Sequence, residues 1–304
     1  MPDAPEEIRA LAERRAAARA ARDFAEADAL RDRIGDAGWA VVDGSSGWRL
    51  EPSVRAVPRR RRAADVPSAL DEPATFDVTL AWVVEGWPED VDRAIASFRS
   101  GSTNTRFQFV VADVTGQPAD RWGSETEVVS LEDGTGWAAA RNASLRRSRG
   151  RIVVALDGSV EAAGDAIGPL EAALGDPSVG VCGPFGMVTD DLREFRRVPE
   201  AGECDAVEGY LMAFRRETLI RVGAFDDRFT WYRSADIEWS FRVHDAGLRV
   251  VAVPVPVEAH EHRMWASLSP GEREARSRRN YSRFLDSWRD RWDLTVRGAP
   301  PQDG

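Results

Sequence analysis

The spacing of apolar and polar positions divides the chain into two parts. Over residues 6–37, apolar positions recur at helical intervals in a stretch rich in Ala, Arg, Glu and Leu, which predicts two helices. Asp23 and Glu26 have the Asp-x-x-Glu form of a capping box, so the second helix is expected to begin there. Apolar runs on both sides of Gly44–Gly47 predict a β-hairpin. We therefore expect a small unit, a helical hairpin plus a β-hairpin, over residues 1–52.

The pattern changes at Phe76, from where apolar strands alternate with helical stretches. Strand 77–84, helix 89–99 and strand 107–113 form a first β-α-β unit. Further elements follow: helix 136–147, strand 151–157, helix 166–174, strand 179–183, helix 237–244 and an amphipathic, Arg-rich helix over 269–292. This alternation predicts the α/β class, with a mainly parallel sheet flanked by helices, over residues 76–295.

Two stretches lie outside these units. Residues 53–75 are rich in Arg and Pro, with four consecutive arginines at 59–62, and predict a mobile linker. Contact of the arginine run with RNA or acidic lipid is the alternative, and a solvated linker is favoured. Residues 296–304 are expected to form a flexible tail.

Composition narrows the class of protein. The chain has 304 residues, of which 43% are hydrophobic, and is long enough to bury a core. Its formal net charge of -10 argues against nucleic acid as the main ligand. Cys182 and Cys204 are the only cysteines, which excludes a disulfide framework and favours the cytoplasm.

The sequence predicts neither a membrane-spanning helix nor a signal peptide. The longest apolar stretches, 78–84 and 250–257, fall well short of the ~20 residues that a spanning helix needs. The acidic first seven residues lack the apolar core of a signal peptide. We expect a cytoplasmic protein, with an interfacial role of helix 269–292 at the inner face of the membrane as an alternative.

Three carboxylates stand at the ends of predicted strands. Glu85 follows the first strand, Asp113 ends the second, and Asp157 ends the strand that begins at residue 151. Ligands of open α/β sheets bind beyond the carboxyl ends of the strands. We therefore expect Glu85, Asp113 and Asp157 around one crevice.

Residues 76–294 resemble family-2 glycosyltransferases with the GT-A fold. The resemblance is carried by a series of motifs that appear in the order and at the intervals of the family. They are Ala140-Arg141-Asn142, Gly150 to Asp157, Gly209 to Arg216, Val222 to Asp226, Ala235-Asp236-Ile237-Glu238-Trp239 and His260-Glu261-His262. The resemblance implies transfer of a sugar from a nucleoside diphosphate sugar to an acceptor hydroxyl.

The resemblance also implies a donor site. Asp113 matches the family carboxylate that binds the nucleoside, although a strand-end turn carboxylate is the alternative. Glu85 lies at the same rim, and Arg141 matches an arginine near the nucleotide. Asp157 matches the first carboxylate of the family's Asp-x-Asp motif.

In that motif the second carboxylate is replaced by Ser159. A divalent cation, Mn or Mg, therefore needs another ligand. The candidates are Glu161, just beyond the motif, and His260, which matches a histidine that supplies a ligand in some relatives. On a strand, Glu258, His260 and His262 would point to one side, and we rank His262 below His260. An exposed histidine is the alternative.

On the acceptor side, Asp236 matches the general base of inverting members, although Ala235 stands where the family commonly has Glu. A helix N-cap is the alternative role for Asp236. Glu238 is a candidate for holding the acceptor. Trp231 and Tyr232 are candidates for sugar contact because sugars pack on flat rings, with core packing as the alternative.

The small unit resembles the C-terminal end of cysteinyl-tRNA synthetases through Arg22–Asp28, Leu30–Asp32 and Gly38. No synthetase site carries over, and a docking or packing module is favoured over RNA contact. The leading hypothesis for the chain is a transferase that acts on a glycan, lipid-linked or small-molecule acceptor. The alternatives are a degenerate nucleotide- or glycan-binding protein and an RNA-associated adaptor.

Overall fold

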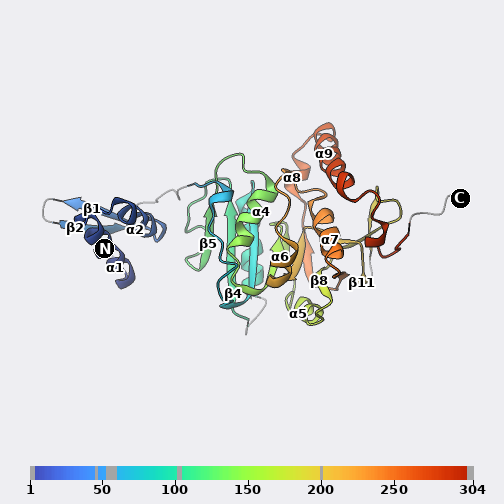
Figure 1. Ribbon diagram of the computed structural model, residues 1–304, viewed down its shortest axis with the longest axis horizontal. Helices are drawn as coiled ribbons and strands as arrows, with labels where there is room; N and C mark the ends of the chain where they lie inside the picture. The colour runs from blue at the N-terminus through green and yellow to red at the C-terminus, as the bar shows by residue number, and fades with distance from the viewer. Residues whose placement is uncertain (1–3, 45–46, 53–59, 101–104, 199–200, 300–304) are drawn as a thin grey trace. The chain divides into compact units, whose positions relative to one another are not determined.

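The structure is a computed structural model that describes residues 4–44, 47–52, 60–100, 105–198 and 201–299 (Figure 1). It divides into two compact units. The small unit comprises residues 1–60 with 116–121, and the large unit comprises residues 61–115 and 122–304.

The small unit contains the predicted helical hairpin and β-hairpin. Its elements are α1 (Glu6–Ala20), α2 (Phe24–Asp36), β1 (Trp39–Gly44) and β2 (Gly47–Pro52). The Asp23 carboxylate accepts a hydrogen bond of 3.1 Å from the Glu26 amide, which caps α2 as predicted. Ile8, Ala12 and Ile34 form its core against both hairpin strands. The unit therefore buries apolar side chains of its own.

The large unit is built on an eight-stranded sheet in the order β11-β14-β8-β13-β6-β3-β4-β5. The strands are β3 (Phe76–Val84), β4 (Phe107–Asp113), β5 (Thr126–Ser130), β6 (Gly150–Leu156), β8 (Val179–Gly183), β11 (Gly202–Glu203), β13 (Leu211–Arg215) and β14 (Arg249–Ala252). Strands β5, β4, β3 and β6 are parallel, as are β8 and β14, whereas β13 and β11 run antiparallel to their neighbours. The predicted α/β class with a mainly parallel sheet is confirmed.

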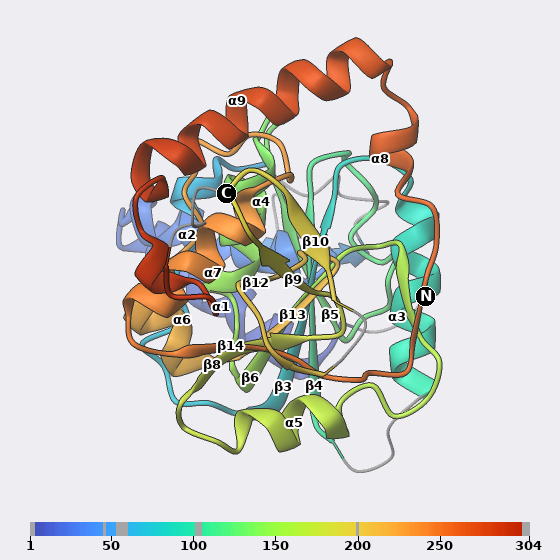
Figure 2. The same ribbon diagram turned by 90° about the vertical axis from the view of Figure 1, so that its right-hand side faces the viewer.

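Helices cover both faces of this sheet (Figure 2). They are α3 (Pro88–Ser100), α4 (Trp137–Arg146), α5 (Gly168–Leu174), α6 (Arg216–Val222), α7 (Ala235–Asp245), α8 (Arg263–Ala266) and α9 (Pro270–Trp288). Because side chains alternate along a strand, Leu80 and Trp82 of β3 pack with α3 and α5, whereas Ala81 packs with α4, α6 and α7. Both faces of the central strands are thereby buried.

Two small sheets and α9 complete the unit. The small sheets join β9 (Gly186–Thr189) to β10 (Phe195–Arg197) and β12 (Ala206–Val207), and β7 (Val160–Ala162) to β15 (Val257–Ala259). A capping box of Ser269 and Glu272 begins α9, which packs on α7 through Phe241, Phe284 and Trp288.

The linker expected over residues 53–75 is shorter in the structure. A 3-10 turn spans Ala63–Asp65, and Val66 and Ala69 are buried against the large unit. The Ala69 amide donates to the Arg146 carbonyl at 2.7 Å, and the Arg216 guanidinium donates to the Ala69 carbonyl at 2.6 Å. Residues 61–75 thus belong to the large unit, because a few apolar side chains are embedded in the Arg- and Pro-rich composition.

The structure describes the expected linker and the expected tail only in part. Residues 53–59 of the expected linker and residues 300–304 of the expected tail lie outside the described residues. The tail begins beside a buried anchor, because the Asp205 carboxylate accepts a hydrogen bond of 2.6 Å from the Val296 amide. Among the described residues, no helix is long and apolar enough to cross a membrane.

Candidate active site

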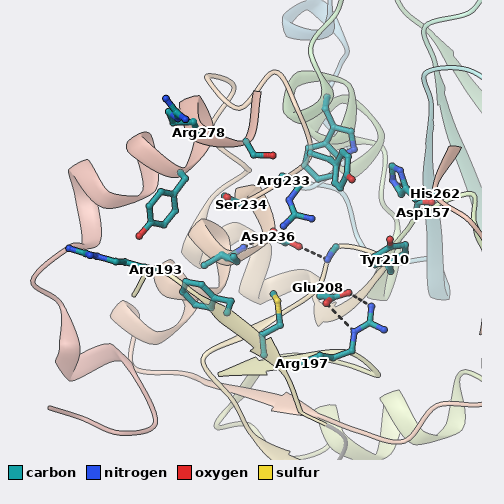
Figure 3. A pocket seen from close by; sticks show the side chains of 18 of the residues that line it. Asp157, Arg193, Arg197, Glu208, Tyr210, Arg233, Ser234, Asp236, His262 and Arg278 are labelled. Carbon is teal, nitrogen blue, oxygen red and sulfur yellow. Dashed lines mark hydrogen bonds and ion pairs between the residues drawn. The ribbon is translucent and has the colours of Figure 1, made fainter. Parts of the chain in front are cut away.

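A pocket of about 560 Å³ opens beside the carboxyl end of β6 (Figure 3). Asp157, Tyr210 and His262 line one end, and Asp236 lies near the middle. Arg193 lies at the opposite end from Asp157. The pocket therefore brings two of the predicted carboxylates, Asp157 and Asp236, to one space.

Asp157 follows β6 directly, and both of its carboxylate oxygens accept hydrogen bonds. Oδ1 accepts from the Ser159 amide at 2.8 Å and from the Ser159 hydroxyl at 2.6 Å. Oδ2 lies 3.1 Å from Nε2 of His262. Although burial opposes ionisation, the hydrogen bonds from His262 and Ser159 hold the pKa of Asp157 at about 2. Asp157 is therefore a carboxylate at neutral pH.

His262 is held from several sides. Its Nδ1 accepts from the Trp265 amide at 3.3 Å, so that His262 caps α8, and in the neutral ring the proton is then on Nε2, facing Asp157. The ring stacks on Tyr232 with centroids 4.3 Å apart and meets the edge of Tyr210 at 5.7 Å. Burial disfavours the imidazolium, but the hydrogen bond to Asp157 and the negative charges of Asp157 and Glu85 together outweigh it and raise the pKa of His262.

The structure brings His262, rather than the favoured His260, to Asp157. Strand β15 ends at Ala259, so the side-chain alternation expected along a strand does not continue to the histidines. The His260 amide donates to the Ser159 carbonyl at 2.8 Å, and Nε2 of His260 lies 2.9 Å from the Glu161 carboxylate. His260 is thus a neighbour of this end of the pocket and points at Glu161.

Arg141, which is buried, and Glu85, which is half-buried, lie close enough to Asp157 for their charges to interact. The Arg141 guanidinium is 1% exposed and donates to the carbonyls of Ala81 at 2.8 Å and Leu156 at 2.9 Å, which ties β3 to β6. Burial lowers the pKa of Arg141 to about 10 and raises that of Glu85 to about 7. In the described part of the chain, Oε2 of Glu85 has no hydrogen-bond partner. Arg141 therefore holds the sheet edge and balances the charge of two carboxylates.

Asp113 ends β4 and is fully buried. Its Oδ1 accepts from the Thr115 amide at 2.8 Å and from the Thr115 hydroxyl at 2.7 Å. This is the strand-end turn given above as the alternative. Asp113 does not line the pocket described here.

Asp236 lies in the first turn of α7, whose N-cap is Ser234, a residue in the left-handed region with φ of 65°. The N-cap is therefore two residues before Asp236, and the N-cap role given as the alternative for Asp236 is wrong. Oδ2 of Asp236 accepts from the Gly209 amide at 2.8 Å, and Oδ1 accepts from the Ile237 amide at 2.9 Å. Burial raises the pKa of Asp236 to about 6.

Of the three acceptor candidates, Tyr232 lines the pocket, whereas Trp231 and Glu238 do not. Trp231 is 4% exposed, with the Arg276 guanidinium over its ring. Glu238 is buried and pairs with Arg242 at 3.0 Å, because two residues along a helix turn the side chain away from Asp236. Sequence reasoning missed Arg193 and Arg233, which lie in turns without any periodic pattern.

The donor groups at the Asp157 end are suited to a divalent cation. Among the described residues, no three His, Cys, Asp or Glu side chains are already arranged as a metal site. Oδ2 of Asp157 and Nε2 of His262 nevertheless face each other, and the partnerless oxygen of Glu85 is buried nearby. Carboxylate oxygens suit Mn or Mg, and an imidazole nitrogen beside them favours the transition metal of the two.

The small unit matches tRNA ligases. Residues 1–48 match the family described as cysteinyl-tRNA ligase anticodon binding domain. The cysteine–tRNA ligase of Opitutus terrae is 53% identical over 51 residues, which cover 17% of this chain and 11% of that protein. The enzyme of Chlamydia trachomatis serovar A is 46% identical over 50 residues, covering 16% and 10%. The chain thus spans about a tenth of the length of these curated relatives.

The large unit is similar to solved glycosyltransferase structures. The crystal structure of GalNAc-T7 with UDP, GalNAc and Mn2+ aligns at a TM-score of 0.60 and 18% identity, over 72% of this chain and 49% of that chain. The mannosyltransferase PcManGT from Pyrobaculum calidifontis, in complex with GDP-Man and Mn2+, aligns at a TM-score of 0.47 and 20% identity, over 74% and 79%. The first similarity supports the expected GT-A fold.

The family assignment rests on the sequence as well. A match to the family described as glycosyl transferase family 2 spans residues 88–242, half of the chain. It includes Asp113, Asp157 and Asp236 and the elements that carry them. The chain belongs to glycosyl transferase family 2.

Proposed function

We propose that the large unit transfers a sugar from a nucleoside diphosphate sugar to an acceptor hydroxyl with inversion, with Asp236 as the general base. The observation that carries the proposal is that one pocket is lined by both Asp236 and the Asp157–His262 pair. Direct displacement needs a base at the acceptor and charge neutralisation at the leaving diphosphate. The two groups meet these needs from different ends of the same space.

Asp236 is suited to accept a proton from the acceptor. Its pKa of about 6 leaves it ionised at neutral pH and basic enough to take the proton as the acceptor oxygen attacks. The new bond forms between that oxygen and the anomeric carbon, and the bond to the diphosphate oxygen breaks. The proton passes to Asp236, and the electron pair leaves with the diphosphate. The Gly209 amide fixes the orientation of the carboxylate.

We assign the nucleoside diphosphate sugar to the end of the pocket that Asp157 and His262 line. Asp157 and His262 are the proposed cation ligands, and we choose His262 over His260 because its Nε2 lies 3.1 Å from Asp157. To bind a cation, Nε2 must give up the proton that faces Asp157, so the ring would take its other tautomer and release the Trp265 amide. A bound cation would neutralise charge that develops on the diphosphate. Glu85 and Asp113 are proposed to lie toward the nucleotide, with Arg141 as a positioning residue. The UDP and Mn2+ held by GalNAc-T7 support this assignment.

The acceptor and the cellular setting complete the proposal. Tyr232 is the residue we assign to acceptor contact, because it lines the pocket beside His262. Cys182 and Cys204 are buried free thiols, which fits a reducing cytoplasm. A catalytically inactive binding protein is the competing function, since Ser159 and Ala235 depart from the family motifs.

A screen of UDP- and GDP-sugars for slow hydrolysis, with Mn, with Mg and with chelator, tests the proposal. We expect metal-dependent hydrolysis of one donor class. Once an acceptor is found, Asp236→Asn should lower transfer by at least about 10²-fold and leave the donor Kd within about threefold, because the amide keeps its size but cannot take the proton.

Asp286→Asn, on an exposed carboxylate of α9, is the matched control and should behave as wild type. Donor binding without hydrolysis or transfer would favour the inactive binding protein. Near-full transfer by Asp236→Asn would remove the general-base assignment, and activity in chelator would remove the metal assignment.

A further inference from the structure

The pocket is lined by four guanidinium groups, of which two have carboxylate partners. Arg197 donates to Glu208 at 3.0 Å, and Arg278 pairs with Glu274 along α9. For Arg193 and Arg233, no carboxylate partner is found within the residues that the structure describes. Within that part of the chain, neither guanidinium therefore forms an ion pair, although the charge of Arg193 acts on Asp191 and that of Arg233 on Asp236.

Hydrogen bonds fix the backbone of the turn that carries Arg193. The Asp191 carboxylate accepts from the amides of Arg193 at 2.7 Å and Glu194 at 2.8 Å. Leu192 is buried in the left-handed region, with φ of 55°, a conformation that disfavours residues other than Gly. Its carbonyl accepts a hydrogen bond of 2.8 Å from the Tyr281 hydroxyl of α9. The turn therefore presents Arg193 to the pocket from a defined position.

The turn that carries Arg233 is fastened to the same helix. Asn280 is 1% exposed and donates to the carbonyls of Trp231 at 2.6 Å and Arg233 at 2.8 Å. The Arg233 guanidinium lies 4.9 Å over the ring of Trp265. Figure 3 shows Arg233 close to Asp236 and Arg193 on the side away from Asp157.

We propose that the acceptor carries an anionic group, a carboxylate or a phosphate, which binds Arg193 while the reacting hydroxyl reaches Asp236. This inference rests on the proposed function. Guanidinium groups bind both anions through paired, charge-assisted hydrogen bonds. Because Asp236 separates Arg193 from the donor end, the anion belongs to the acceptor and not to the donor diphosphate. The chain carries a net charge of -10, so an anionic acceptor needs such a local positive site.

Matched acceptor pairs test the inference. The pairs are methyl glucoside against methyl glucuronide, and glycerol against glycerol 3-phosphate, so the two arms separate a carboxylate from a phosphate. Ligand-observed NMR measures binding to the UDP-loaded protein, and UDP release measures transfer. We expect the anionic member of at least one pair to bind at least about tenfold more tightly, the range of one charge-assisted interaction.

Arg193→Gln should abolish this preference and raise the KM for the anionic acceptor by about tenfold or more, and Arg193→Lys should restore part of it. Arg196→Gln is the matched control, because Arg196 lies on β10, three residues beyond Arg193, is exposed, pairs with Asp190 and does not line the pocket. Equal binding within every pair, or a preference that survives Arg193→Gln, overturns the inference. Failure of donor hydrolysis in the earlier screen instead overturns the proposed function.

Discussion

Asp157 and Asp236 line one pocket but differ in what surrounds their carboxylates. Three hydrogen bonds, from His262 and Ser159, stabilise the charge of Asp157 and keep its pKa at about 2. Asp236 accepts two backbone amides, and burial still raises its pKa to about 6. Carboxylates whose surroundings separate their pKa values in this way take different roles in catalysis. Asp157, which stays ionised, is suited to ligand binding, and Asp236, whose pKa is raised, is suited to proton transfer.

The raised pKa of Asp236 predicts the pH dependence of transfer. The base must be ionised, so kcat should be constant above about pH 7 and fall about tenfold per pH unit below pH 6. A pH profile at saturating donor and acceptor measures this. A profile that stays flat down to pH 5 would contradict the assignment of Asp236.

The stability of Asp236→Asn serves as the control for that profile. A carboxyl whose folded-state pKa is raised stabilises the fold while it is protonated, and this contribution is lost as the pH rises through about 6. The amide avoids the buried charge. Its Nδ2 cannot accept a hydrogen bond, however, so one of the two backbone amides that Asp236 accepts loses its partner. Because the two effects oppose each other, thermal melts at pH 8 should place the variant within about 4 °C of the wild-type melting temperature, so that lost transfer cannot be attributed to unfolding.

At the scale of elements, the sequence predicted strands and helices that have a local pattern of apolar residues. It did not predict contacts that depend on how those elements pack. Strands 107–113 and 179–183 occur as predicted, because apolar runs bounded by polar residues are local signals. The helix that carries Arg141 was also predicted. That its guanidinium would bond the carbonyls of two strands depends on where α4 packs, which no local pattern encodes.

The positions of His260, His262 and Arg193 also depend on features that local sequence patterns do not encode. The sequence around His260 has the alternating pattern of a strand. In the structure, however, strand β15 ends at Ala259, and the His262 side chain caps α8. Arg193 follows a buried residue with positive φ, a conformation that Leu gives no reason to expect. Family motifs identified Asp236 and Asp157, whereas the walls of the pocket required the structure.

Helix α9 holds the turn before α7 through one side chain, and this predicts the effect of Asn280→Ala. The change leaves the buried carbonyls of Trp231 and Arg233 without donors, so we expect a loss of about 2–4 kcal/mol in the free energy of unfolding. Urea unfolding measures it. Ser282→Ala, at an exposed position of α9, should change stability by less than about 0.5 kcal/mol. Equal stability of the two variants would show that the turn does not depend on Asn280.

At the scale of the whole molecule, each unit has its own core. In the small unit, Arg15 is 4% exposed and donates to both oxygens of Asp43 at 3.0 and 2.9 Å, beside the cluster around Ile34. Every residue of the candidate site lies in the large unit. The small unit is therefore proposed as a docking or packing module that catalysis does not require.

Two truncated proteins test whether the small unit is independent of the large unit and where the boundary between them lies. Removal of residues 1–52 should leave the melting temperature of the large unit and the rate of donor hydrolysis unchanged, because residues 60–75 remain. Removal of residues 1–75 should cost at least about 3 kcal/mol, since it exposes the site of Val66 and takes the carbonyl partners from Arg146 and Arg216. Unfolding in urea compares the two. A large loss on the shorter truncation would mean that the small unit is part of one fold, and equal stability of both would return residues 60–75 to the linker.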